Sequence, residues 1–325
     1  MAVAALAASL RASLSILGKR DIQTAATAIG QSVLSTMGDP IRLGDDCAAI
    51  PDGDGYLLLA AEGIWPQLVA ESPWFAGWCA VMVNLSDVAA MGGTPIAVVD
   101  ALWSQSEAIS QPLWAGMTAA AKAYGVPIVG GHTNCHSDYD GLAVAVLGRA
   151  PQLITSFDAQ PGDVLVMMVN LAGQYYADYP FWNAATEADP AQLRQHLALL
   201  PKLAETKLCH AGKDISMGGV AGTLLMLTEA SGCGAILDLD RVPQPPKVPS
   251  RKWLTSFPSF GFLLAVPPEN VVQVVDTVTP YGLNCQAIGK VTDGTKVWLT
   301  QASEKAMLWD LAHPLTGFGT TARQG

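Results

Sequence analysis

The sequence has few charged residues and no long apolar run. Only 14% of its 325 residues are Asp, Glu, Lys or Arg, whereas roughly a quarter are charged in an average soluble domain. Half of the residues are hydrophobic, which excludes an intrinsically disordered chain, because disorder requires low hydrophobicity and high charge. No apolar stretch reaches the roughly 20 residues that a membrane-spanning helix needs, so we expect no membrane association.

An excess of basic residues is also lacking. The chain has 18 Lys+Arg against 28 Asp+Glu, a formal net charge of −10 and a pI of about 4.8. Nucleic-acid binding requires a basic face, so we expect no nucleic-acid partner. The apolar composition favours a surface buried in an oligomer or a large cleft, and the length predicts two domains of about 150 residues each.

The cysteines form no C-x-x-C pair. Six are scattered along the chain: Cys47, Cys79, Cys135, Cys209, Cys233 and Cys285. This pattern favours reduced thiols and a cytoplasmic location over a disulfide framework. A zinc site at His132, Cys135 and His136 stays open as an alternative, although a fourth ligand at finger-like spacing is lacking.

Apolar patterning predicts two halves that meet at a turn over residues 158–163. At the N-terminus, Leu6, Leu10, Leu14 and Leu17 predict a helix that Gly18 ends, rather than a signal peptide. For the rest of the first half we expect strands over 56–61, 95–102, 126–129 and 142–147, and helices over 78–91 and 113–124. For the second half we expect strands over 164–169, 235–239, 262–266, 285–288 and 297–300, helices over 191–208, 219–230 and 268–278, and a loop over 243–249.

Neither standard phosphate loop, G-x-x-x-x-G-K-[ST] or G-x-G-x-x-G, occurs. Instead, acidic or small polar residues gather in five places, most of them Gly-rich corners: Gly44-Asp45-Asp46, Ala61-Glu62-Gly63, Asn84-Leu-Ser86-Asp87, Gly130-Gly131-His132-Thr133 and Lys213-Asp214-Ile-Ser216-Met-Gly218-Gly219. Carboxylate oxygens suit Mg²⁺ together with substrate phosphates. Glycine corners and helix N-termini let backbone N–H groups approach an anion. These features predict ATP with Mg²⁺ as the ligand.

Each of these motifs also has a plain structural interpretation. Asp45 and Asp46 fit a solvated turn, and Asp87 fits a surface position on a helix. Gly130-Gly131 fits an ordinary turn, His132 a structural histidine, and Asp214 a helix N-cap.

In chain order, the motifs resemble a known superfamily. Residues 44–50 (GDDCAAI) are similar to its G-D-D-A-A-V segment, and residues 84–95 (NLSDVAAMGGTP) to N-L-S-D-x-A-A-M-G-x-x-P. Residues 130–133, 161–165 and 214–221 resemble G-G-[DEH]-[TS], P-G-D-x-[LI] and D-x-[ST]-x-G-G-[LV]-A. The superfamily contains aminoimidazole ribonucleotide (AIR) synthetase, thiamine-monophosphate kinase, selenophosphate synthetase and the hydrogenase-maturation carbamoyl dehydratase.

The resemblance implies a two-domain α+β fold: a PurM-like N-terminal domain over residues 1–155 and a PurM-like C-terminal α/β sandwich over 156–325. It implies a homodimer whose N-terminal sheets pair into a shared barrel near the ATP site. It also implies an ATP- and Mg²⁺-dependent enzyme that transfers a phosphoryl group to an oxygen of a small metabolite.

The resemblance further implies roles for particular residues. Asp87, Asp214 and His132 would be catalytic. The metal ligands would be Asp45, Asp46, Glu62, Asp87 and Asp214. Asn84 would support the turn that carries Asp87. Residues that would line the nucleotide or phosphate pocket are Gly44, Asn84, Gly130, Gly131, His132, Thr133, Gly218 and Gly219.

The chain departs from each named member. Glu62 stands where the family usually has Asp, and Met217 replaces the second Asp of the kinase segment D-x-S-D-G. No Cys precedes Cys47, none follows Cys285, and residues 62–68 lack the Lys of AIR synthetase. The lack of an N-terminal Cys argues against selenophosphate synthetase, and the lack of a C-terminal Cys argues against the carbamoyl dehydratase. The missing Lys argues against AIR synthetase. We expect a divergent member with its own substrate. A thiamine-monophosphate kinase-like kinase and a non-catalytic nucleotide-binding scaffold or sensor are the alternatives.

An aromatic cluster follows residues 170–173. It comprises Tyr175, Tyr176, Tyr179, Phe181 and Trp182. Such rings bury much apolar area. They fit a lid or pocket wall that stacks on a substrate ring, or the core packing or dimer contact of an extended loop.

Overall fold

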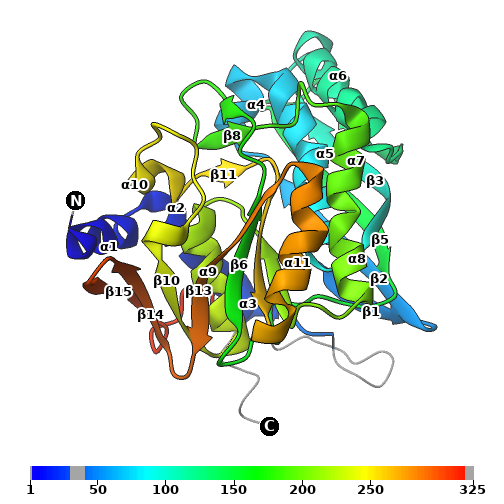
Figure 1. The fold of residues 1–325 in the computed structure, drawn as a ribbon. Helices are drawn as coiled ribbons and strands as arrows, with labels where there is room; N and C mark the ends of the chain where they lie inside the picture. The colour runs from blue at the N-terminus through cyan, green and yellow to red at the C-terminus, as the bar shows by residue number, and fades with distance from the viewer. Residues whose placement is uncertain (1, 30–40, 319–325) are drawn as a thin grey trace. The chain divides into compact units, whose positions relative to one another are not determined.

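The computed structural model, drawn in Figure 1, describes residues 2–29 and 41–318. The chain divides into two compact units. Unit 1 contains Met1–Asp46, Ile154–Ala184 and Thr206–Gly325, and unit 2 contains Cys47–Leu153 and Ala185–Glu205. Each unit combines helices with a mixed sheet, which confirms the predicted two-domain α+β class. The boundary at residue 155 stays a prediction, and the outermost residues of the predicted domains (1 and 319–325) lie outside the described ones.

Unit 2 is built on a five-stranded sheet in the order β1-β2-β5-β3-β4. Its strands are β1 Ala48–Asp52, β2 Gly55–Gly63, β3 Thr94–Trp103, β4 Ile128–Asn134 and β5 Gly141–Ala150. Only β3 and β4 pair in parallel. The patterning did not predict β1, a short hairpin partner of β2 that begins two residues after Asp46.

Alternation along the strands gives this sheet two unlike faces. Leu58, Val144 and Val146 are buried on the face against which helix α5 packs. Leu59 and Leu147 pair across β2 and β5 on the opposite face and are 48% and 38% exposed. The second face is therefore apolar and uncovered in the described chain.

Two long helices, α5 Pro73–Ala90 and α6 Glu107–Tyr124, pack closely against each other in unit 2. A Cβ atom on Gly77 would lie 2.1 Å from the Leu113 carbonyl oxygen, and one on Gly116 would lie 1.9 Å from the Trp74 carbonyl oxygen. The two glycines therefore permit the close approach of the helix backbones. The other helices of unit 2 are α4 Pro66–Glu71, α7 Pro190–Leu197 and α8 Leu199–Glu205.

Unit 1 is built on a seven-stranded sheet in the order β15-β14-β10-β13-β6-β12-β9. Its strands are β6 Val164–Val169, β9 Ala211–Asp214, β10 Gly234–Asp238, β12 Gly261–Val266, β13 Asn284–Thr292, β14 Lys296–Gln301 and β15 Glu304–Asp310. Every residue of β12 is buried, which requires cover on both faces of the sheet.

The helices that cover the faces of this sheet are far apart in the sequence. One core cluster joins Leu165 and Met167 of β6 to α9 Gly219–Ser231 and to α1 Val3–Arg11. The alternate β6 residues, Val166 and Met168, are buried outside that cluster, on the side where α11 Val271–Val278 contacts β6 and β13. Further elements of unit 1 are η1 Gly18–Asp21, α3 Ile22–Ile29, η2 Leu239–Arg241, α10 Ser250–Trp253, η3 Pro268–Asn270 and η4 Thr279–Tyr281.

Three predictions of local structure were wrong. The N-terminal helix breaks after Arg11, and a short α2 Leu14–Leu17 follows. Leu6 and Leu10 are buried, but Leu14 is 84% exposed because the break takes it off the apolar stripe. Gly18 is the C-cap of α2, as predicted, and a 3₁₀ turn begins there. The helix expected over 191–208 is two helices, α7 and α8. Residues 130–133 continue β4 instead of forming a corner after it.

A small three-stranded sheet was not predicted. It contains β7 Gln174–Tyr175, β8 Phe181–Asn183 and β11 Phe257–Pro258. Within the described residues, no helix combines the length and the apolar character that crossing a bilayer requires.

The close approach of α5 and α6 predicts a position that does not tolerate a side chain. Gly116→Ala should lower the free energy of unfolding by about 1–3 kcal/mol, because its methyl group would overlap the Trp74 carbonyl. Chemical denaturation measures the change. Gly63→Ala is the matched control, since a Cβ there meets nothing within 4 Å. Equal stability of the two variants would contradict the packing described.

Candidate functional site

The turn at Gly44–Asp46 holds two carboxylates in unit 1. Gly44 has a φ of +103°, and a Cβ there would lie 2.5 Å from the Phe318 side chain. Both facts require glycine at this position. The glycine of the G-D-D motif therefore has a structural reason that is independent of any nucleotide.

Asp45 is held by Ser156. The Ser156 backbone N–H donates to Asp45 Oδ2 at 2.9 Å, and the Ser156 hydroxyl donates to Oδ1. Burial and the neighbouring Asp46 carboxylate raise the pKa of Asp45 to about 6, although Lys213 and the Ser156 hydrogen bonds act in the opposite direction. The Asp45 carboxylate therefore ties the turn at residues 44–46 to Ser156.

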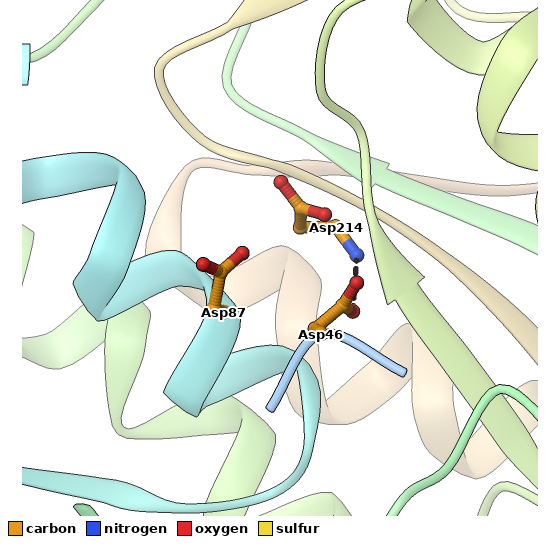
Figure 2. Close-up of side chains that lie close together, drawn as sticks. All are labelled: Asp46, Asp87 and Asp214. Atoms are coloured by element: carbon orange, nitrogen blue, oxygen red, sulfur yellow. Dashed lines mark hydrogen bonds between the residues drawn. The ribbon is translucent and has the colours of Figure 1, made fainter. Parts of the chain in front are cut away.

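Asp46 lies between two groups of strand β9. Its Oδ1 accepts a hydrogen bond from the Lys213 ammonium. Its Oδ2 accepts one from the Asp214 backbone N–H at 3.3 Å, drawn as the dashed line in Figure 2. Two segments 168 residues apart in the chain therefore meet at one carboxylate.

Lys213 and Asp46 form a buried ion pair. The Lys213 side chain is 8% exposed and that of Asp46 is 5% exposed. The ammonium also lies 3.4 Å from the Ser156 hydroxyl. Burial disfavours the charged ammonium, but the carboxylates of Asp46, Asp45 and Asp214 outweigh it and raise the pKa of Lys213 above its usual value.

Asp214 ends β9 and is buried. It pairs with Phe262 of β12, and its carbonyl accepts a hydrogen bond from the Thr223 hydroxyl at 3.2 Å. The N-cap interpretation of Asp214 is wrong, because the N-cap of α9 is Gly218.

Gly218 and Gly219 link β9 to α9 in a left-handed conformation. Their φ angles are +98° and +61°, and a Cβ on Gly219 would lie 2.5 Å from the Leu254 carbonyl oxygen. Backbone conformation and packing account for both glycines. Their predicted contact with nucleotide stays a prediction.

Asn84 and Asp87 lie on α5 of unit 2 and are buried. The Asn84 amide donates to the Ala80 carbonyl at 2.8 Å, one turn earlier on the same helix. This hydrogen bond anchors Asn84 to α5, and the suggested support of Asp87 stays a prediction. Figure 2 labels Asp87 on this helix.

Glu62 and Asp100 lie on one face of the unit 2 sheet. Glu62, near the end of β2, pairs with Val144, which pairs with Asp100 of β3. Asp100 is buried, and burial raises the pKa of its carboxyl. It pairs with Gly131, where a Cβ would lie 2.3 Å from Asp100 Oδ1. The Asp100 carboxyl thus explains the second glycine of the G-G-H-T motif.

The ring centroids of His132 and Trp103 lie 5.8 Å apart. Gly130 and Thr133, the first and last residues of the G-G-H-T motif, lie on the same strand as His132 and are exposed. The zinc interpretation of His132, Cys135 and His136 is wrong for the described residues, since the grouping of His, Cys, Asp and Glu side chains that could hold a metal does not include them.

The aromatic cluster packs mainly on itself. Tyr175 and Trp253 both contact Trp182 edge-on, and Trp182 is buried. Tyr179 stacks on Phe181, with ring centroids 5.5 Å apart. The core-packing interpretation therefore accounts for Trp182, at the centre of the cluster.

The donor set around Asp46 and Asp214 suits a hard cation. Both residues offer carboxylate oxygens alone, and Mg²⁺ prefers oxygen ligands at one or two carboxylates with the remainder from water and phosphate. The two carboxylates come from a turn and a strand end that packing holds in place. The residues therefore fit the metal that the sequence predicts.

Two residues of chemical interest received no role from the sequence. Lys213 is a charged residue next to Asp214 in the sequence. Asp100 is an acidic residue within the predicted strand 95–102. Each is a charged residue on a strand where an apolar one is usual. That signal marks both as candidates.

Comparison with known sequences finds several relatives. An uncharacterized protein of Synechocystis sp. is 56% identical over 311 residues, which cover 95% of this chain and 96% of that protein. The thiamine-monophosphate kinase of Pyrococcus horikoshii is 28% identical over 290 residues, which cover 83% of this chain and 89% of the kinase.

Solved structures share the fold. The structure of AaThiL complexed with AMPPCP and TMP has a TM-score of 0.64 and 20% identity, covering 89% of this chain and 96% of that one. T. maritima PurL complexed with ATP has a TM-score of 0.71 and 20% identity, covering 83% of this chain and 46% of that one. This chain thus spans about half the length of the PurL chain it matches.

Two family models match in succession along the chain. The N-terminal domain of AIR synthase related protein matches residues 44–150, and its C-terminal domain matches residues 160–300. Together they cover more than half of the sequence, in the order that the motifs predicted. The chain therefore belongs to the family of AIR synthase related proteins.

Proposed function

We propose that this protein is an ATP- and Mg²⁺-dependent enzyme that phosphorylates an oxygen of a small metabolite, or activates that oxygen by phosphoryl transfer. Thiamine-monophosphate kinase, an enzyme named for phosphoryl transfer, aligns with 83% of the chain. The family membership supports the proposed reaction class, and the carboxylate oxygens of the site support the proposed metal.

The convergence of Asp46 and Asp214 is the observation that supports the proposal most strongly. Buried carboxylates repel each other and lose hydration, so placing them side by side is costly unless a cation offsets their charge. The segments that carry them are two family motifs. Lys213 offsets one of these two charges, and a divalent cation would offset the other, which a scaffold without chemistry would not need.

Following the family resemblance, we assign Asp46, Asp87 and Asp214 as metal ligands. Mg²⁺ would supply charge neutralisation for the transferred phosphoryl group. Asp45, bonded to Ser156, would position the turn, and Glu62 is assigned as an outer ligand with a longer arm than Asp. Gly44, Asn84, Gly218, Gly219 and residues 130–133 keep their predicted places at the nucleotide, with His132 near the reacting phosphate.

Two alternatives make different predictions for the same assay. A thiamine-monophosphate kinase would consume ATP with thiamine monophosphate, although Met217 stands where that kinase has Asp. A scaffold or sensor would bind ATP without turnover, and Met217 and Glu62 favour it. A panel of small metabolites that includes thiamine monophosphate separates all three.

ATP turnover should depend on Mg²⁺ and on Asp87. Asp87→Asn should lower turnover by about 100-fold or more, because the amide weakens cation binding where phosphoryl charge is stabilised. Release of ADP, measured with and without chelation of Mg²⁺ against the metabolite panel, tests this outcome.

The matched control for this assay is Asp276→Asn, which removes an exposed acid from α11 and should leave turnover unchanged. Absence of ATP binding at millimolar Mg²⁺ would contradict the whole proposal. Binding without turnover on every metabolite would favour the scaffold.

We also propose that the protein is a homodimer formed through the uncovered face of the unit 2 sheet. Leu59, Val99 and Leu147 alternate onto this face and are 38–48% exposed. Apolar side chains grouped on a sheet face are typical of an interface. A second copy that covers the face with its own sheet matches the shared barrel that the resemblance implies.

Leu147→Glu should convert the dimer into a monomer, since it places a charge in the centre of the proposed interface. Light scattering coupled to size-exclusion chromatography measures the mass. Val272→Glu, at a valine of α11 that is 70% exposed, is the control and should leave the mass unchanged. A dimeric Leu147→Glu variant would exclude this face as the interface.

We place the activity in the cytoplasm. The six cysteines all lie among the described residues, and none forms a disulfide. Free thiols are typical of a reducing compartment.

A further inference from the structure

We infer that Lys213 is a built-in counter-cation of the acidic site: its ammonium neutralises Asp46 while no metal is bound, and a divalent cation must compete with it for that carboxylate. The inference rests on the proposed function, because it takes Asp46 and Asp214 to bind the cation. It makes Lys213 a positioning residue that acts through Asp46.

The hydrogen bonds described for the Lys213 ammonium lie at the acidic turn and at the residue that holds it. The ammonium is bonded to Asp46 and approaches the hydroxyl of Ser156 at 3.4 Å. Ser156 in turn bonds Asp45 through both its hydroxyl and its backbone N–H. One buried ammonium thus contacts both the second carboxylate of the turn and the residue that holds the first.

The charge balance of this region is negative. Asp45, Asp46 and Asp214 contribute three carboxylates close to one lysine. A carboxylate left buried without a partner destabilises a protein far more than a complete ion pair stabilises it. Without Lys213, the turn at residues 44–46 would need another cation in order to fold.

The same geometry predicts competition. Asp46 presents Oδ1 to Lys213 and Oδ2 to the backbone N–H of Asp214, so both of its oxygens are engaged before a metal arrives. A divalent cation at Asp46 meets the repulsion of the nearby ammonium. Lys213 therefore weakens the binding of free Mg²⁺, and this penalty falls when a negatively charged phosphate accompanies the metal.

A purely structural ion pair makes a different prediction. If Lys213 only filled a buried position, its loss would destabilise the protein equally with and without Mg²⁺. If it stands in for a cation, Mg²⁺ should restore the stability that its loss removes. The dependence of thermal stability on Mg²⁺ separates the two cases without any measurement of activity.

The experiment compares the melting temperatures of wild type and Lys213→Met, each in EDTA and in millimolar Mg²⁺ without nucleotide. In EDTA the variant should melt roughly 6–20 °C below wild type, the shift expected for breaking a buried ion pair in a domain of this size. Mg²⁺ should recover most of that loss in the variant and move wild type little.

Two further variants control the measurement. Lys213→Arg keeps the charge and should melt independently of Mg²⁺, as wild type does. Glu229→Gln alters another buried carboxylate of unit 1, which accepts hydrogen bonds from Leu315, Thr316 and Gly317. It should melt lower than wild type and gain no response to Mg²⁺.

Binding of Mn²⁺ gives an independent reading. By electron paramagnetic resonance, Lys213→Gln should bind free Mn²⁺ at least about tenfold more tightly than wild type, because the competing ammonium is absent. Equal affinities, or a Lys213→Met variant that Mg²⁺ does not rescue or that fails to fold at every Mg²⁺ concentration, would overturn the inference. Failure of wild type to bind Mn²⁺ with ATP would instead overturn the proposed function.

Discussion

The mutual repulsion of buried carboxylates is the constraint on which the organisation of this site depends. Two unit charges 4 Å apart interact by about 4 kcal/mol at an effective dielectric constant of about 20, and Asp45, Asp46 and Asp214 lie close enough to perturb one lysine together. The chain meets this cost with a buried ammonium, a serine hydroxyl and backbone N–H groups. The pattern of these partners determines which carboxylate oxygens remain for the metal that we propose.

Packing far from the turn keeps the carboxylates in place. Strand β9 pairs with β12, whose residues are all buried between covering helices. This sheet fixes Lys213 and Asp214, while Gly44 and Ser156 fix the opposing turn. Packing thus holds the two segments that carry the ligands we propose. Asp45, whose pKa is raised by burial and by Asp46, helps to hold the turn through Ser156.

The sequence motifs alone were enough to predict the family and to mark Asp46 and Asp214 as candidate ligands, because their spacing is tied to chemistry. The apolar runs placed β6 and α9 within a residue of their observed bounds. Local sequence patterns failed where contacts between distant residues determine the structure. Strand β4 continues through Gly130-Gly131 because it pairs with β3. Lys213 pairs with a residue 167 positions away, and the apolar periodicity of the sequence does not indicate that pairing. Backbone geometry by itself accounts for several glycines that the motifs share.

We propose, from the family resemblance, that Asp46, Asp87 and Asp214 bind the metal that accompanies ATP. A crystal structure of the protein grown with a non-hydrolysable ATP analogue and Mn²⁺ tests it most directly, through the anomalous scattering of manganese. We predict a manganese peak within about 2.0–2.3 Å of carboxylate oxygens of these residues and in contact with the analogue's phosphates. A bound analogue whose manganese contacts none of the three would contradict the account.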